Sequence, residues 1–257
     1  MSVTYKSGFT IIETMLFLAV TGVLVVAILA GTGTSINIQR YHDSVSTLKS
    51  VLEQQYSEVT TVRNEARATD LSCNSSAVID GSGPKLPRGQ SDCVVLGRYI
   101  TIVDTAITIS TVIGNTAASS VPTSDIAELQ TYNLSLLPAS TETSSLEWGA
   151  RIAWPVSGGG LRNPTTPRTI SLLILRSPTS GLTYTFSGDS TDTSTPVLSL
   201  KDMIKPGIVI PGQSERTICV DSDGGFGGGL AVFVGAYASN ASFIEVHSND
   251  MGYSSKC

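Results

Sequence analysis

The strongest constraint in this chain is one uninterrupted apolar segment near its start. Phe9–Ala30 runs for 22 residues and contains a single charged side chain, Glu13. At 1.5 Å per residue, a helix of this length is about 33 Å long, which is enough to cross the hydrocarbon core of a bilayer. A cleavable secretory signal has a shorter apolar stretch, of about 7 to 15 residues. The segment therefore predicts a membrane-spanning helix rather than an ordinary signal peptide.

The basic residues around this segment predict its orientation. Lys6 precedes the span, whereas the next basic residue, Arg40, comes ten residues after it. Positively charged flanks stay on the cytoplasmic side of a membrane. We therefore expect the amino terminus in the cytoplasm and everything after the span to be exported.

The composition agrees with export. Only 14% of the residues are charged while 41% are hydrophobic, which is the opposite of the balance in a disordered chain. The net charge of −5 supplies no general attraction for phosphate backbones, so we predict no specific nucleic-acid partner. With 35 Ser, 29 Thr, 24 Gly and two His among 257 residues, the chain is typical of an exported β-rich surface protein and atypical of a cytoplasmic enzyme.

The start of the span also carries a family resemblance. Lys6–Leu16 has the sequence KSGFTIIETML. It resembles the class III signal of type IV prepilins and type II secretion pseudopilins, in which a basic leader ends in Gly and the mature chain begins with Phe and has Glu as its fifth residue. The resemblance covers roughly Lys6–Ala30. It implies that a prepilin peptidase cuts between Gly8 and Phe9, that the new Phe9 amine is N-methylated, and that Glu13 guides subunit docking.

The same resemblance implies a set of partners and locations. The precursor would lie in the cytoplasmic membrane as a single-pass protein, and the assembled form would lie in an extracellular pilus at the cell surface. Its partners would be other pilin subunits, the prepilin peptidase, a pilus assembly platform protein and the membrane itself.

Glu13 has a physical reason to be paired, apart from any family. A carboxylate in the bilayer core costs a few kcal/mol on insertion scales, so an intramembrane acid is a candidate functional residue. Cleavage after Gly8 would create an amine on the Phe9 of a neighbouring subunit, at a depth where it could reach Glu13. We therefore expect these two groups to pair during docking. The alternative is that Glu13 extends toward the cytoplasmic interface.

Beyond the span, the pattern becomes that of an amphipathic helix. Apolar residues recur at steps of three, four or seven from Tyr41 to Ala66, and charged residues fall mostly off this stripe. We expect one helix to continue from the span into this stem. Gly22, Gly31 and Gly33 each lower helix propensity by about 1 kcal/mol, so we expect local unwinding there in an assembled filament, with close helix packing as the alternative at Gly22.

The chain after this stem has the pattern of a β-rich domain. Short runs rich in Val, Ile, Thr and aromatic residues are bounded by Gly, Pro, Ser or Asp, which is typical of strands. We predict an α+β fold in which a long N-terminal helix packs on an antiparallel β-sheet. The predicted parts are a leader at 1–8, a transmembrane or filament-core helix at 9–30, an amphipathic stem helix at 31–70 and an extracellular globular domain at 71–257.

The individual elements of this domain are predicted from the same signals. The expected strands are Val94–Val103, Ala106–Ile113, Ile170–Leu175, Leu182–Phe186, Ile208–Ile210, Ile218–Val220, Leu230–Val234 and Phe243–Val246. Short helices are expected at Ile126–Leu137 and Leu200–Ile204, and surface loops at 80–90, 114–124, 157–167 and 187–196. We expect Trp148 and Trp154 to pack in the core; an exposed adhesive surface is the alternative.

Four cysteines lie beyond the span, and we predict that they form disulfides. They are Cys73, Cys93, Cys219 and Cys257, and an exported domain lies in an oxidising compartment. Three pairings are open. The short loops of Cys73 with Cys93 and Cys219 with Cys257 are the easiest to close, and this arrangement is similar to the carboxy-terminal disulfide region of many pilins. A zinc site is disfavoured because the chain has no C-x-x-C pair and its two His are far apart.

A weak calcium candidate lies near the carboxyl end. Asp221 and Asp223 alternate before a Gly-rich run, but the third acidic ligand and the Glu of a calcium loop are absent. A Gly-rich hairpin is the preferred interpretation. The sequence also contains no nucleophile elbow, zinc-protease motif, phosphate loop or dinucleotide motif, so we predict no enzymatic activity and no cofactor.

The leading functional hypothesis is a type IV pilin-like structural subunit that assembles through its N-terminal helix into a filament for adhesion, motility or DNA uptake. Two alternatives stay open: a pseudopilin of a type II secretion or competence system, and a membrane-anchored extracellular adhesin. Three N-x-S sequons, at Asn74, Asn133 and Asn240, permit glycosylation, but such motifs arise readily by chance in a Ser-rich chain.

Overall fold

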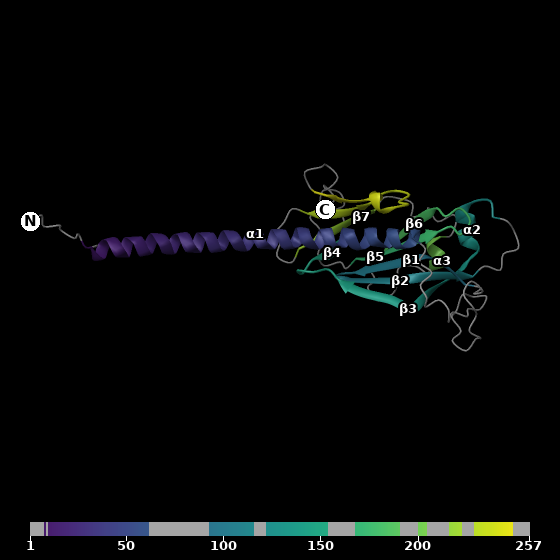
Figure 1. Ribbon diagram of the computed structural model, residues 1–257, viewed down its shortest axis with the longest axis horizontal. Helices are drawn as coiled ribbons and strands as arrows, with labels where there is room; N and C mark the ends of the chain where they lie inside the picture. The colour runs from purple at the N-terminus through teal and green to yellow at the C-terminus, as the bar shows by residue number, and fades with distance from the viewer. Residues whose placement is uncertain are drawn as a thin grey trace, which may run out of the picture. The chain divides into compact units, whose positions relative to one another are not determined.

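The computed structural model describes residues 8, 10–61, 93–115, 122–153, 168–190, 200–204, 216–222 and 229–248 (Figure 1). These residues form the predicted α+β fold, with a long N-terminal helix and an antiparallel β-sheet domain. The chain divides into two compact units, Met1–Arg40 and Tyr41–Cys257.

One helix, α1 (Ile11–Thr60), runs through the span and into the predicted stem. It continues without a break past Gly31 and Gly33, as expected for the isolated chain, because a Gly in a helix costs only about 1 kcal/mol. The rest of the predicted stem, residues 62–70, lies outside the described residues.

The apolar stripe predicted from Tyr41 onward is confirmed. The buried residues of α1 are Tyr41, Ser44, Val45, Leu48, Leu52, Gln55, Tyr56 and Val59. They recur at steps of three and four and so form one face of the helix. Within the first unit, by contrast, no described residue of α1 is buried.

Five strands form the larger sheet, and all of its pairings are antiparallel. Their spatial order is β3-β2-β1-β5-β6. The strands are β1 (Val94–Val103), β2 (Ala106–Asn115), β3 (Asn133–Ser145), β5 (Thr169–Arg176) and β6 (Thr183–Ser190).

The second sheet has four strands in the order β4-β7-β8-β9, and its pairings are also antiparallel. The strands are β4 (Arg151–Ala153), β7 (Arg216–Asp221), β8 (Leu230–Val234) and β9 (Ile244–His247), with a short 3-10 helix, Ala241–Phe243, before β9. The predicted strand Ile208–Ile210 lies outside the described residues.

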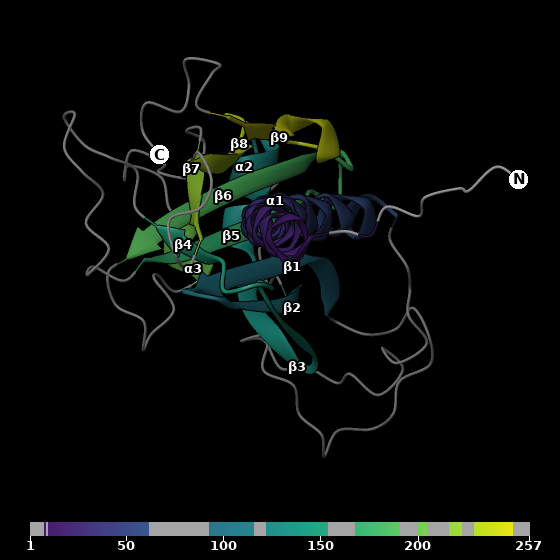
Figure 2. The same cartoon turned by 90° about the vertical axis from the view of Figure 1, so that its left-hand side faces the viewer.

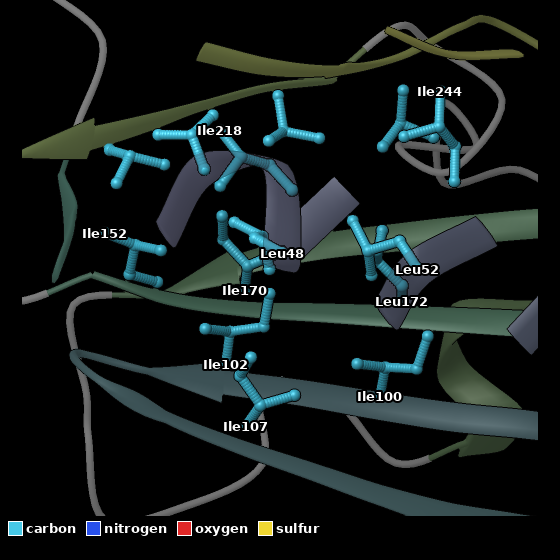
Figure 3. Close-up of a cluster of buried hydrophobic side chains, with 14 of the residues drawn as sticks. Leu48, Leu52, Ile100, Ile102, Ile107, Ile152, Ile170, Leu172, Ile218 and Ile244 are labelled. Carbon is cyan, nitrogen blue, oxygen red and sulfur yellow. The ribbon is translucent and has the colours of Figure 1, made fainter. Parts of the chain in front are cut away.

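The core of the globular unit lies between the two sheets and encloses the buried half of α1 (Figures 2 and 3). Leu48 and Leu52 of the helix belong to the same buried cluster as Ile100 and Leu172 of the five-stranded sheet and Ile218 of the four-stranded sheet. The helix is thus the middle layer of the core, rather than a cover on one side of a single sheet.

The five-stranded sheet is buried on both faces. In β5, Ile170, Leu172 and Ile174 belong to the cluster around α1, while Leu173 and Leu175 belong to a second cluster. This alternation follows from side chains pointing to opposite faces at successive strand positions. The second cluster also contains residues of α2 (Asp125–Thr131) and α3 (Leu200–Met203).

A close approach between β1 and β5 requires glycine at position 97. A Cβ on Gly97 would lie 1.8 Å from the carbonyl oxygen of Ile174, far inside van der Waals contact. The register of β1 against β2 also shifts between Val95 and Gly97, as at a β-bulge.

Several predicted boundaries were wrong. The expected helix Ile126–Leu137 is the shorter helix α2, because the chain turns extended at Tyr132 and continues as β3. The expected loop 187–196 begins inside β6, since Ser187–Ser190 pair with β5. Trp148 is 55% exposed rather than in the core, because it lies in the turn between β3 and β4. Trp154 lies outside the described residues.

Candidate functional site

The amino end of α1 carries a reciprocal capping arrangement built from Thr10 and Glu13. The Glu13 backbone N–H donates to Thr10 Oγ1 at 3.3 Å, and the Thr10 backbone N–H donates to Glu13 Oε2 at 3.4 Å. A helix leaves its first N–H groups without intrahelical partners, and a Thr followed three positions later by Glu satisfies two of them. The T-x-x-E spacing in the sequence was the signal for this cap.

The cap changes what is expected of Glu13. Its carboxylate lies in the first turn of α1, where the helix dipole favours negative charge. The side chain has an intrachain partner in Thr10, so a neighbouring subunit's amine would have to compete with, or add to, this contact. The contact with Thr10 was not predicted from the sequence.

The predicted processing site lies at the edge of the described residues. Gly8 is exposed, and a Cβ there would meet no atom within 4 Å. Phe9, the predicted site of cleavage and methylation, lies outside the described residues, so both predictions stay open.

The first unit presents a continuous apolar surface. Its exposed large hydrophobic residues are Ile11, Ile12, Met15, Leu16, Phe17, Leu18, Val20, Val23, Leu24, Val25, Val26, Ile28, Leu29, Ile36 and Ile38. Among the described residues, α1 is the one helix long and apolar enough to cross a membrane by length and composition. It is therefore a candidate membrane anchor.

The hydroxyl groups of this segment are satisfied inside the helix. Thr14 Oγ1 donates to the Ile11 carbonyl at 2.9 Å, and Thr21 Oγ1 donates to the Phe17 carbonyl at 2.9 Å. Thr32 makes the same kind of bond to the preceding turn. A polar group in lipid is costly unless it is hydrogen-bonded, so these threonines are compatible with an apolar surrounding.

Three glycines of the helix are not required by packing within the chain. A Cβ at Gly22, Gly31 or Gly33 would meet nothing within 4 Å. Glycine weakens a helix relative to alanine. At these positions the loss of helix stability is not offset by any packing within the described part of the chain that requires glycine.

In the globular unit, two phenols tie α1 to the sheets on either side of it. The Tyr41 hydroxyl donates to the Val220 carbonyl at 2.8 Å and accepts from the Leu230 N–H at 2.7 Å, which joins the helix to β7 and β8. The Tyr56 hydroxyl is 2.8 Å from Thr185 Oγ1 in β6. Burial raises the pKa of Tyr56 to about 12, although the hydrogen bond to Thr185 lowers it.

An ion pair holds the end of the helix to β1. Arg98 Nη2 lies 2.6 Å from Glu58 Oε2, and Arg98 Nη1 donates to Thr111 Oγ1 at 2.9 Å. Both side chains are partly shielded from solvent. The buried face of α1 is therefore fixed by polar contacts at several points along its length.

The cysteines are only partly described. Cys93 and Cys219 are disulfide-bonded, and none of the described cysteines is a free thiol. Cys73 and Cys257 lie outside the described residues, so the predicted pairing of the four is untested.

The weak calcium candidate is also only half described. Asp221 ends β7 and lies opposite Arg151 of β4 in the backbone register of the two strands. Asp223 lies outside the described residues. Within the described ranges, no three His, Cys, Asp or Glu side chains are grouped to hold a metal ion. The predicted strands on either side of the Gly-rich run do pair as antiparallel β7 and β8.

The arrangement thus provides an exposed apolar helix with one capped carboxylate at its start, continuous with a helix half embedded in a two-sheet core. Searches against protein-family models, curated proteins and solved structures found no match to this chain.

Proposed function

We propose that this protein is a type IV pilin-like structural subunit. Its precursor is held in the cytoplasmic membrane by the first half of α1 with the amino terminus in the cytoplasm, and is cut between Gly8 and Phe9 by a prepilin peptidase. The processed chain is then passed by a pilus assembly platform protein into an extracellular filament of similar subunits.

The observation that carries the proposal is the exposed apolar surface of the first unit. Residues such as Ile12, Leu16 and Leu24 are more than half exposed. Lipid can cover this surface in the precursor, and helices of other subunits can cover it in a filament. The sequence around Gly8 and Phe9 resembles that of prepilins, which supports covering of this surface by the helices of other subunits.

The three glycines support the same proposal. Small residues allow helices to approach closely, and Gly22, Gly31 and Gly33 have no packing role within one chain. In a bundle of these helices, they provide places where neighbouring backbones come together or where the helix unwinds.

Glu13 is proposed to set the register of docking. In the precursor, its carboxylate is held by Thr10, and after cleavage the Phe9 amine of the adjacent subunit approaches it. An unpaired carboxylate is strongly unfavourable in an apolar bundle, so subunits in the wrong register are disfavoured.

The test compares Glu13→Ala with Glu53→Ala in cells that make the filament. Glu53 is a matched control because it is an acidic residue of the same helix and forms only an exposed pair with Lys49 at 3.5 Å. We expect both variants to be inserted and cleaved, but only Glu13→Ala to be missing from sheared filaments. Intact-mass analysis of the filament fraction should show a chain that begins at Phe9 and carries one added methyl group.

Surface material that retains Met1 or begins near Gly31 would overturn the proposal, because then the prepilin processing is wrong. Normal incorporation of Glu13→Ala into filaments would overturn only the pairing of Glu13 with the Phe9 amine, because then the carboxylate does not select the register. A processed protein that supports secretion, with only short filaments, would identify the pseudopilin alternative.

A further inference from the structure

The loop between β8 and β9 presents one of the three sequons at the surface. Asn240, Ala241 and Ser242 form the motif N-A-S, and the side chain of Asn240 is exposed. The loop is held at its base by a hydrogen bond from the Gly235 N–H to the Phe243 carbonyl at 2.9 Å. The acceptor asparagine of the motif is thus displayed on a closed loop.

The motif adopts a geometry in which Ser242 bonds to the amide oxygen of Asn240. The Ser242 N–H and Ser242 hydroxyl both donate to Asn240 Oδ1, at 2.9 Å and 2.6 Å. A backbone N–H is only a donor, so the atom it contacts must be the amide oxygen. Within the described residues, the hydrogen bonds of the Asn240 side chain use Oδ1 alone, which leaves Nδ2 available to solvent.

An exposed aromatic ring precedes the asparagine by three residues. Tyr237 is 67% exposed and has a φ of 57°, a conformation that is rare and strained for a bulky residue. The next residue, Ala238, is buried in the core, which fixes the backbone beside the ring. The fold therefore holds a large aromatic side chain in solvent, in the loop that displays Asn240.

We propose that Asn240 is an acceptor for an N-linked oligosaccharide, and that Tyr237 provides a surface for the first sugar. The donor class is a sugar carried on a polyprenyl pyrophosphate, used by a membrane oligosaccharyltransferase. A bond forms between Asn240 Nδ2 and sugar C1, the bond from C1 to the pyrophosphate oxygen breaks, polyprenyl pyrophosphate leaves, and a base of the transferase takes the Nδ2 proton. No redox change occurs.

The bonds made by Ser242 suit this step. Hydrogen bonds to the amide oxygen draw electron density from the amide and make its N–H protons easier to remove. The apolar face of a sugar ring can stack on an aromatic ring, so the exposed Tyr237 ring offers a surface on which the first sugar can pack. The inference rests on the proposed function only for the export of the globular unit.

The second described sequon lacks these features. Asn133 is the first residue of β3 and pairs with Asn115 of β2. Its Oδ1 accepts from Lys201 Nζ at 3.0 Å, and Ser135 lies in the same strand opposite Ile113. An extended, paired strand does not offer the turn found at Asn240, so Asn133 is expected to stay unmodified.

The test is peptide mass mapping of the full-length protein recovered from the outside of its native cells. Trypsin cuts after Arg216 and Lys256, and the peptide between them contains one sequon, that of Asn240. We expect a sugar mass on this asparagine in the wild type and in Asn133→Gln, and none in Asn240→Gln or Ser242→Ala. Tyr237→Gly accommodates the positive φ and should lower occupancy about twofold through loss of the ring.

The outcomes separate the two proposals. Unmodified Asn240 in exported protein, or a sugar only at Asn133 or Asn74, overturns this inference and leaves the filament proposal standing. A sugar at Asn240 on a chain that never enters filaments supports this inference and counts against the filament proposal. A chain found only inside the cell overturns both.

Discussion

The two halves of α1 are one continuous helix but have opposite surroundings. In the first half, Leu24 is 56% exposed, whereas Leu48 in the second half is 0% exposed. Apolar residues surround the first half on all sides, while those of the second half are confined to one stripe. The stripe matches an amphipathic helix in a globular core, and the all-round pattern matches a helix that needs an apolar environment from outside the chain.

A helix can therefore be continuous along its length and still be stabilised by different surroundings in its two halves. The second half is stabilised by the two sheets that enclose it. The hydrogen bonds described for the first half are local to the helix: its backbone bonds, the cap at Thr10 and Glu13, and threonine hydroxyls bonded to the preceding turn. Isolated helices in water are marginal. Lipid or neighbouring helices would have to supply the rest.

The largest expected effect comes from shortening the same residue type in each half. Leu48→Ala should lower the free energy of unfolding by about 2 to 5 kcal/mol, because it leaves a cavity between the helix and both sheets. Leu24→Ala is the matched control and should leave that free energy unchanged. Denaturant unfolding of the detergent-solubilised chain measures both, and equal losses would contradict the division of the helix into two environments.

A smaller effect is expected from alkaline pH through Tyr56. Its pKa is raised from 10 to about 12, mainly by burial. The neutral buried phenol therefore contributes stability that is fully present below pH 10 and is lost as the pH rises toward 12, in total about 2 to 3 kcal/mol. The free energy of unfolding, measured from pH 9 to 12, should fall more steeply for the wild type than for Tyr56→Phe. Parallel curves would show that the phenol ionises as freely as in the unfolded chain.

The smallest effect is expected at the point where burial begins. Tyr41→Phe keeps the ring but removes the hydroxyl that bonds to the Val220 carbonyl and the Leu230 N–H. Leaving these buried groups without that partner should cost about 1 to 2 kcal/mol. Thermal unfolding measures the loss, and hydrogen exchange at the Leu230 amide should quicken; His42→Phe, one position along on the exposed face, should change neither.

Local patterns in the sequence predicted the helix and most strands. The bounds of β1 and β8 were predicted correctly, because each is a compact apolar run between turn residues. The buried face of α1 was predicted because its period is intrinsic to a helix. What these elements share is that their signal lies within a few neighbouring residues.

The misses came from contacts between distant parts of the chain. β3 is a strand because it pairs along β2, and its Ser- and Thr-rich second half carries no apolar signal. β4 has only three residues and is defined by its partner β7. The division into two sheets around a central helix likewise depends on which strands meet, which a single sequence does not show.

At the candidate site, the sequence singled out Glu13 but not its local hydrogen bonds. Glu13 was singled out because a charge is rare in an apolar span, yet its contact with Thr10 was missed, although the T-x-x-E spacing was present. Trp148 was expected in the core because aromatic residues usually are buried, and its exposure follows from a turn with a φ of 60° that the sequence does not reveal.

The central position of α1 in the globular unit also has a mechanical consequence. Tyr41 bonds the helix to the four-stranded sheet near the start of its buried half, and Tyr56 bonds it to the five-stranded sheet near the end. A tensile load along the helix axis would be shared by both sheets over this whole length. A helix lying on the outside of one sheet can be peeled away turn by turn, whereas this one must be sheared past all its neighbours at once, which suits the unit to bear tension.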